Sequence, residues 1–182
     1  MTDILVLVGS LRAASVNRQI ADVAAEVAAS EGIGAAVYEG LGDVPFYNED
    51  LDVADNADAP AAVVALRAAA ARADAVLVVT PEYNGTIPAV LKNAIDWLSR
   101  PYGAGALNDK PLAVIGSALG QYGGVWAHDD TRKSFGIAGA RVIEDITVSV
   151  PSGTFDGKHP RENAQLVQDV RESVEKLVAN VS

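Results

Sequence analysis

The sequence contains no cysteine, which excludes disulfides, thiolate metal ligands and a cysteine nucleophile. It also lacks any apolar run near the roughly 18 residues that a membrane-spanning helix requires, so we expect no membrane segment. The amino-terminal stretch MTDILVLVGS carries an acidic residue, Asp3, and only a short apolar run, unlike a secretory signal peptide. Together these absences predict a cytoplasmic protein.

An excess of positive charge is also lacking, because the formal net charge is −10. Nucleic-acid binding needs a basic surface that displaces counterions, so we expect no nucleic-acid partner. Residues 39–58 carry many of the acids and no basic residue, a pattern typical of a solvated loop. The first twenty residues have the opposite balance, with Arg12 and Arg18 against the single acid Asp3. This local positive excess raises the prospect of an anion site.

The chain has 182 residues, of which 49% are apolar and 21% are charged. This length and composition predict one globular domain spanning residues 1–182. Buried, continuous apolar runs alternate with stretches of helical period along the chain. The expected strands are 3–10, 35–39, 73–80, 110–117 and 140–150, the last of which Glu144-Asp145 can interrupt. The expected helices are 15–30, 59–73, 86–100, 124–138 and 160–181, the last with Pro160 at its first position.

This alternation predicts an α/β fold, a doubly wound sheet of five parallel strands with helices on both faces. Such sheets bind their ligands outside the carboxyl ends of the strands, where the chain order reverses. The loops after the first, third and fourth strands are therefore the places to search for a site.

The first of these loops, GSLRAASVNR at 9–18, joins a strand to a helix N-terminus. It lacks both the Gly-Lys-Ser/Thr of a P-loop and the G-x-G-x-x-G of a dinucleotide site. Its side chains and the unpaired N–H groups of the helix start can bind a phosphate; the candidate ligands are Ser10, Arg12, Ser15 and Asn17. The helix's first turn carries Arg18 and no acid, which also suits a bound dianion. The alternative is that Ser15 only caps the helix and Arg12 is a surface residue.

The second loop, TPEYNG at 80–85, leads from a strand into a helix. Asn-Gly between apolar runs usually marks a β-hairpin turn, but the run that follows has a helical period, so we do not expect a hairpin here. Pro81 ends the strand pairing, Tyr83 offers a flat ring, and Gly85 allows close backbone approach. Exposed N–H groups at 83–86 could therefore bond to a planar heterocycle. The alternative is a turn whose Tyr83 packs on the core.

The third loop, GSALGQYGGV at 116–125, is dense in glycine after a central strand, which indicates either close backbone approach or ordinary flexibility. Its candidate residues are Ser117, Gly120, Tyr122, Gly123 and Gly124. A phosphate site in the first loop and a flat-ring site in the other two fit a mononucleotide along the sheet edge. A dinucleotide would need a longer crevice.

The stretches GSLRAASVNR, PEYNGTIPAVLKNAIDWLSR and GSALGQYGG resemble the NADPH-dependent FMN reductase family, over essentially the whole chain and with the quinone and chromate reductases most alike. The resemblance implies the flavodoxin-like strand order 2-1-3-4-5 and FMN as cofactor. It places the FMN phosphate on Ser10, Arg12, Ser15 and Asn17. The isoalloxazine ring would lie along Pro81, Glu82, Tyr83, Asn84 and Gly85, with Ser117 and Gly120 nearby. It also implies a homodimer or homotetramer.

With FMN bound, NADPH or NADH would supply hydride and a small molecule such as a quinone, free flavin or metal oxyanion would accept the electrons. No catalytic side chain or metal is then expected. Two alternatives share this fold: a flavodoxin-type electron carrier, which the acidic stretch favours and the arginine of the phosphate loop disfavours, and a non-catalytic nucleotide-binding domain. His128 beside Asp129 and Asp130 is interpreted as a helix-surface residue rather than a metal ligand.

Overall fold

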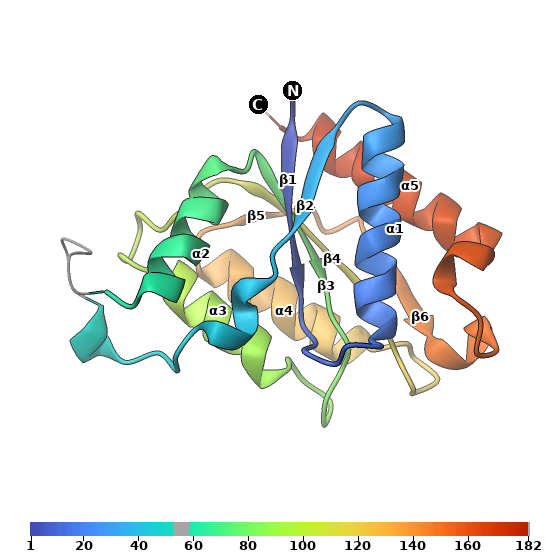
Figure 1. Ribbon diagram of the computed structural model, residues 1–182, viewed down its shortest axis with the longest axis horizontal. Coiled ribbons are helices and arrows are strands. Elements are labelled where there is room, and N and C mark those ends of the chain that lie inside the picture. The colour runs from blue at the N-terminus through green and yellow to red at the C-terminus, as the bar shows by residue number, and fades with distance from the viewer. Residues whose placement is uncertain (53–58, 182) are drawn as a thin grey trace.

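The computed structural model describes residues 1–52 and 59–181. Within them, a parallel sheet runs in the order β2-β1-β3-β4-β5, with a further short strand, β6, also paired to β4 (Figure 1). The predicted α/β class and strand order are therefore confirmed. The strands are β1 (Asp3–Val8), β2 (Gly34–Val37), β3 (Ala75–Val79), β4 (Pro111–Ala118), β5 (Arg141–Val142) and β6 (Ser149–Pro151).

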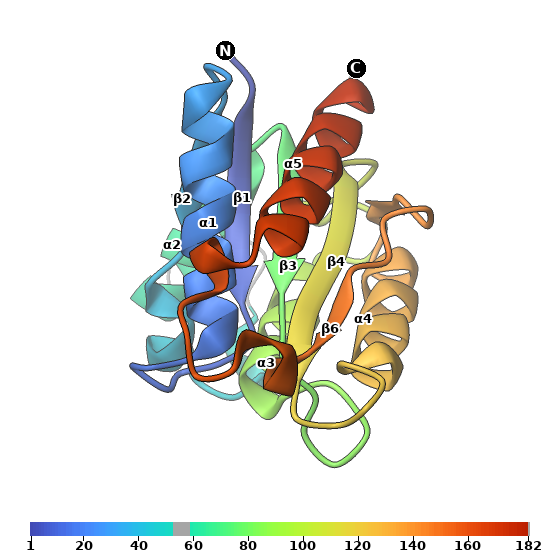
Figure 2. The same ribbon diagram turned by 90° about the vertical axis from the view of Figure 1, so that its right-hand side faces the viewer.

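Five α-helices cover the two faces of the sheet in the described part of the chain. Helices α1 and α5 lie side by side on one face, and α2, α3 and α4 cover the other (Figures 1 and 2). Their bounds are α1 (Val16–Ser30), α2 (Ala61–Arg72), α3 (Ala89–Leu98), α4 (Val125–Ile137) and α5 (Ala164–Ala179). No helix among the described residues is long and apolar enough to cross a membrane.

The central strands are apolar throughout because both of their faces are buried. Along β1, Ile4 and Val6 contribute to the core under α1 and α5, whereas Leu5 and Leu7 contribute to the core under α2, α3 and α4. The same division holds along β3 and β4. Each continuous apolar run thus contributes side chains to two cores, one on each side of the sheet.

The expected last strand, 140–150, is split in two, as the acidic pair within it allowed. β5 pairs with the start of β4 and β6 pairs with its end. In the gap, the guanidinium of Arg132 donates from Nη2 to the carbonyls of Val114 at 2.9 Å and Ile146 at 3.0 Å. A side chain of α4 therefore replaces the missing ladder hydrogen bonds at this edge.

Two further segments have a different structure from the one expected. The last helix does not begin at Pro160: residues Pro160–Glu162 form a separate 3₁₀ turn, and Asn163 caps α5 by accepting from the N–H of Leu166 at 3.0 Å. The acidic stretch contains the 3₁₀ turns Gly40–Asp43 and Glu49–Leu51, so its described part is not one solvated loop. The rest of that stretch, with its acids Asp55 and Asp58, lies outside the described residues.

Candidate functional site

The three loops selected from the sequence meet at the carboxyl edge of the sheet, the lower edge in Figure 1. Gly116 of β4 marks the point where they converge. A Cβ on Gly116 would lie 2.1 Å from the carbonyl oxygen of Thr80 and 2.8 Å from both Asn17 Oδ1 and His128 Nε2. Only glycine fits there, because atoms of three other segments, the residue after β3, α1 and α4, already fill the space.

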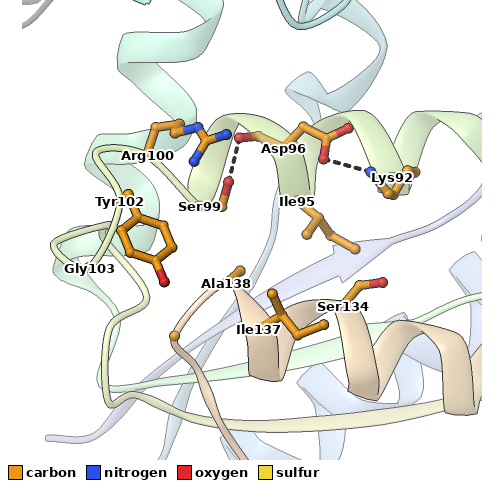
Figure 3. Close-up of a pocket in the computed structure, with 11 residues that line it drawn as sticks. Lys92, Ile95, Asp96, Ser99, Arg100, Tyr102, Gly103, Ser134, Ile137 and Ala138 are labelled. Atoms are coloured by element: carbon orange, nitrogen blue, oxygen red, sulfur yellow. Dashed lines mark hydrogen bonds and ion pairs between the residues drawn. The ribbon is translucent and has the colours of Figure 1, made fainter.

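Another pocket lies between α3 and α4. It has a volume of about 420 Å³ and is lined by α3 from Lys92 onward, by the end of α4 and by the segment after α3 (Figure 3). Two helix C-termini carry partial negative charge, and Lys92 is already paired with Asp96 at 2.6 Å. Arg100 is a further cation of this pocket, and its guanidinium donates to the Tyr47 hydroxyl at 3.3 Å. The three loops remain the better candidate site because they lie at the edge where parallel sheets bind their ligands.

The first loop offers backbone donors. The N–H groups of Ala13, Ala14, Val16 and Asn17 donate to no acceptor within the described part of the chain, as the start of a helix requires. Ser10 and Arg12 line a pocket of about 230 Å³ at this loop. Arg12 is exposed and its guanidinium has no partner among the described residues. Unpaired N–H groups beside a free guanidinium are a donor set that suits an anion.

The side chains of Ser15 and Asn17 make hydrogen bonds that stabilise this loop. The Ser15 hydroxyl oxygen accepts from the N–H of Arg18 at 3.4 Å, so it caps α1, and its O–H remains able to donate. The buried Asn17 amide clamps the end of β4: its Nδ2 donates to the Ser117 carbonyl and its Oδ1 accepts from the Ser117 N–H, both at 2.8 Å. Asn17 therefore fixes the first loop against the third.

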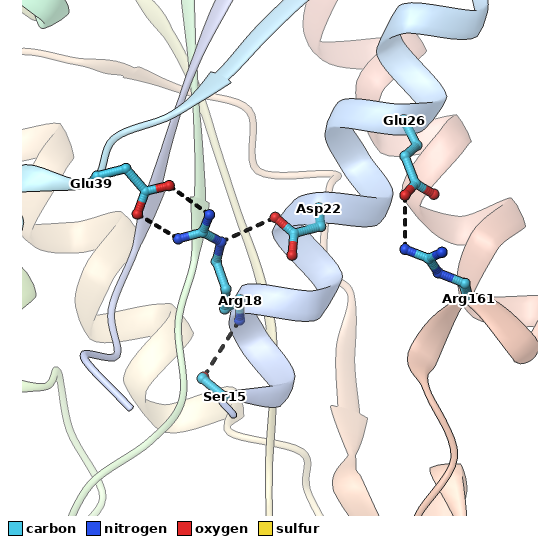
Figure 4. A network of polar contacts seen from close by, with 6 residues as sticks. All are labelled: Ser15, Arg18, Asp22, Glu26, Glu39 and Arg161. Atoms are coloured by element: carbon cyan, nitrogen blue, oxygen red, sulfur yellow. Dashed lines mark hydrogen bonds and ion pairs between the residues drawn. The ribbon is translucent and has the colours of Figure 1, made fainter. Parts of the chain in front are cut away.

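Arg18 does not add to the positive charge available to an anion. Its guanidinium binds both carboxylate oxygens of Glu39, at 2.5 and 2.6 Å, and Asp22 at 3.0 Å (Figure 4). The hydrogen bond from Arg18 lowers the pKa of Glu39. The expectation that Arg18 suits a bound dianion is therefore wrong, because two carboxylates already neutralise it, one of them 21 residues away.

The second loop is a hairpin turn after all. Tyr83 and Thr86 exchange backbone hydrogen bonds of 3.2 Å in both directions. Asn84 and Gly85 have φ values of 53° and 76°, the positive pair that a type I′ turn requires. The N–H groups of Tyr83 and Thr86 are consequently closed to a ligand, and those of Asn84 and Gly85 at the tip stay open. Tyr83 is 49% exposed, so it does not pack in the core.

Glu82 connects the second loop to α4. Its carboxylate accepts from the N–H of Ala127, the third residue of α4, at 3.2 Å. The cap residue of α4 is Gly124, which has no side chain to do this. A carboxylate at a helix N-terminus is favoured by the helix dipole, so Glu82 caps α4 from another element. The buried Pro81 lies at the start of the same loop.

The third loop holds a buried donor without a partner. The Ser117 hydroxyl is shielded from solvent and makes no hydrogen bond within the described residues. Gly120 faces open space, since a Cβ there would meet nothing within 4 Å. Gly123 is required for packing, because a Cβ on it would lie 2.5 Å from the carbonyl carbon of Ser149. Part of the glycine density thus serves close approach to β6 instead of to a ligand.

The interpretation of His128 as a helix-surface residue is wrong, because its ring is fully buried between α4 and the sheet. Nε2 lies 2.9 Å from the Thr80 carbonyl and Nδ1 lies 2.6 Å from Ser149 Oγ. A carbonyl can only accept, so Nε2 carries the proton and Nδ1 accepts from the serine. Burial lowers the pKa of His128. The spacing of the buried α4 residues is the signal that identifies this face: His128, Thr131, Arg132 and Phe135.

Trp126 is a second residue without a predicted role. It lies at the second position of α4, 57% exposed, and its Cε3 would be 3.8 Å from a Cβ on Gly85. Among residues 1–52 and 59–181 there is no group of three or more side chains able to hold a metal ion.

Several known proteins are similar to this chain in sequence or in fold. The family model of the NADPH-dependent FMN reductases matches residues 2–155. A quinone reductase of Pseudomonas putida is 45% identical over 132 residues, which cover 72% of this chain and 68% of that protein. A 2-hydroxy-1,4-benzoquinone reductase of a Burkholderia species is 41% identical over 71% of this chain and 67% of its own. The solved structure of FerB, a flavoenzyme NAD(P)H:(acceptor) oxidoreductase of Paracoccus denitrificans, matches 99% of both chains with a TM-score of 0.83 and 30% identity.

Proposed function

The chain belongs to the NADPH-dependent FMN reductase family, and we propose that it is an FMN-dependent oxidoreductase that passes electrons from NAD(P)H to quinones. The observation that carries the proposal is the convergence of a phosphate-type loop and an open hairpin tip at one edge of the sheet. In the net reaction, NAD(P)H, a proton and a quinone give NAD(P)⁺ and a hydroquinone.

The residues of this edge fit FMN. The unpaired N–H groups of the first loop, with Ser10, Arg12 and the Ser15 hydroxyl, would hold the phosphate. Asn17 holds that loop in place through Ser117. The N–H groups of Asn84 and Gly85 would bond to the edge of the ring, with Tyr83 exposed beside them. The partnerless Ser117 hydroxyl and the open Gly120 complete the set.

When bound, FMN accepts hydride from the nicotinamide and delivers the electrons to the acceptor. The protein's own part is binding and orientation. Glu82 holds the second loop on α4, and His128 holds the end of β3 through the Thr80 carbonyl. The second loop is therefore anchored to α4 at two points before any ligand arrives, which reduces the ordering cost of binding.

An electron carrier without NAD(P)H turnover is the second candidate. The net charge of −10 favours it, since carriers use charge to meet their partners. The identity of 45% to a quinone reductase weighs against it. Turnover of the nicotinamide separates the two functions.

The experiment is to load the purified protein with FMN and follow oxidation of NADPH and NADH with and without 1,4-benzoquinone. We expect quinone-dependent oxidation only in the loaded protein, with parallel double-reciprocal plots because both substrates use one stacked site in turn. Absence of FMN binding would refute the proposal. FMN binding without NAD(P)H oxidation would establish the carrier instead.

We also propose that the protein is a homodimer or homotetramer that works in the cytoplasm, where NAD(P)H is available. The groove between α3 and α4 supports self-association. Ile95 of α3 and Ile137 of α4 face each other across it, beside the ring of Tyr102 (Figure 3). Ile137 is 74% and Tyr102 is 86% exposed, and exposed apolar side chains that gather in one place mark contact surfaces.

A further inference from the structure

Two aromatic rings stand in solvent at the start of α4. Tyr122 and Trp126 have ring centroids 5.8 Å apart and planes inclined by 49°. They are 58% and 57% exposed, whereas the other tryptophan of the chain, Trp97, is fully buried. Aromatic side chains gain most from burial, so an exposed pair is a candidate contact surface. We call Tyr122 and Trp126 the aromatic wall.

The aromatic wall is fixed against the hairpin of the second loop. Trp126 lies beside Gly85, as noted above, and two hydrogen bonds bracket that contact. Glu82 accepts from the Ala127 N–H at 3.2 Å, and the Thr86 hydroxyl donates to Asp130 at 2.7 Å. One bond comes from each side of the hairpin tip, so the aromatic wall is held in a fixed position relative to the tip.

The charge near the wall is negative. Glu82, Asp129 and Asp130 all lie within this part of the molecule. Arg132 is the first lysine or arginine of α4 and is buried, with Nη2 donating to the Val114 and Ile146 carbonyls and Nη1 paired with Asp129 at 2.9 Å. Glu82 and Asp130 have no such cationic partner among the described residues. An approaching anion would thus meet carboxylates without a compensating exposed cation on the first two turns of α4.

We propose that the aromatic wall selects uncharged, planar aromatic acceptors over inorganic oxyanions, with Trp126 as the main determinant. The inference rests on the proposed function and names the acceptor class of the same site. A quinone of two fused rings covers more of the indole than a quinone of one ring, whereas a tetrahedral oxyanion has no flat face to stack. Selection therefore increases with the area of the acceptor's flat face.

The test compares the FMN-loaded protein with its Trp126→Ala and Trp126→Phe variants, using 1,4-naphthoquinone, 1,4-benzoquinone and chromate with NADPH. Stacking on an aromatic side chain is worth about 1–3 kcal/mol, or roughly five- to a hundredfold. We expect Trp126→Ala to lower the ratio of kcat/KM for naphthoquinone over chromate by about tenfold, and the ratio for benzoquinone over chromate by less. Trp126→Phe should restore most of the loss, because it retains a flat ring.

A general disturbance of the site would lower kcat/KM for all three acceptors by the same factor, and this result would overturn the inference. So would an unchanged ratio in Trp126→Ala. Either outcome leaves the proposed function standing if the unaltered protein binds FMN and turns over NADPH with a quinone. A protein without that turnover would overturn both.

Discussion

Of the two arginines in the first loop, one is paired with carboxylates and the other is not, and this difference decides their roles. Arg18 is held by Glu39 and Asp22 (Figure 4), whereas Arg12 is exposed and unpaired within the described chain. An anion can thus recruit Arg12 without breaking an existing ion pair. In the sequence, both arginines lie in one positive stretch. The pairing of Arg18 with Glu39 could not be predicted there, because it depends on the crossover from α1 to β2.

We therefore expect Arg12→Ala to weaken FMN binding by about ten- to a hundredfold, the equivalent of one lost charge-assisted hydrogen bond at about 1.5–3 kcal/mol. Its free energy of unfolding should stay within about 0.5 kcal/mol of the unaltered value, as for an exposed side chain. Fluorescence titration with FMN measures the first quantity and urea unfolding the second. Arg161→Ala, which removes an exposed arginine paired with Glu26, is the control. Unchanged FMN affinity in Arg12→Ala would remove the phosphate assignment.

His128 predicts a dependence of stability on pH. Burial lowers the pKa of its imidazole below the usual 6.5, and the nearby Arg132 acts in the same direction; the Thr80 carbonyl, Glu82 and Asp129 oppose the shift. Below that pH the unfolded chain binds the proton more readily than the folded one, so stability is present above about pH 6.5 and is lost as the pH falls.

Urea unfolding at pH 7.5 and 5.5 measures this effect in the unaltered protein and in His128→Gln, which can still donate to Thr80 and accept from Ser149. We expect the free energy of unfolding to fall by up to about 1 kcal/mol more in the unaltered protein than in the variant, since one pH unit corresponds to about 1.4 kcal/mol. Equal losses in the two proteins would show that His128 does not cause the dependence.

At the scale of elements, the central strands were predictable and the irregular segments were not. Residues 4–8 and 75–79 are apolar without interruption because both faces are buried. The sequence did not predict the hairpin at Asn84-Gly85. The residues that follow have a helical period, and in the sequence this pattern is evidence against a turn of only two residues. The predicted loops do lie at the carboxyl edge of the sheet, but Glu82 and Asn17 bond to protein groups that lie 45 and 100 residues away.

The gap between β5 and β6 depends on Arg132, whose guanidinium is the donor to two carbonyls there. Arg132→Met keeps much of the volume but leaves buried acceptors without a donor, at about 1–3 kcal/mol each. We expect the free energy of unfolding to drop by about 2 kcal/mol or more in urea. Lys133→Met, at the exposed neighbouring position, should stay close to the unaltered protein. Similar stability of the two variants would show that the sheet edge does not depend on this side chain.

At the scale of the whole molecule, the three candidate loops and the groove between α3 and α4 occupy different places. The loops lie at the carboxyl edge of the sheet, and the groove is lined by α3 from Lys92 onward and by the end of α4 (Figures 1 and 3). The strand alternation predicted the first place, because parallel sheets bind ligands at that edge. The groove had no signal in the sequence, since it depends on how two helices pack.

Self-association through this groove predicts that Ile137→Asp dissociates the protein. The new carboxylate would add to the existing Asp96 in the groove, and burying a second acid in a contact is unfavourable. Sedimentation velocity should show a smaller species for Ile137→Asp and no change for Val64→Asp, an exposed apolar position on α2. A single unchanged species in all three proteins would place any subunit contact elsewhere.

Electron transfer from a nicotinamide to a quinone through FMN at this carboxyl edge is the proposed function. Its most direct test is anaerobic stopped-flow absorbance of the FMN-loaded protein, mixed first with NADPH and then with 1,4-naphthoquinone. We predict that NADPH removes the absorbance of oxidised flavin and that the quinone restores it, each in a single turnover. Absorbance that NADPH leaves unchanged, or that the quinone fails to restore, would contradict the claim.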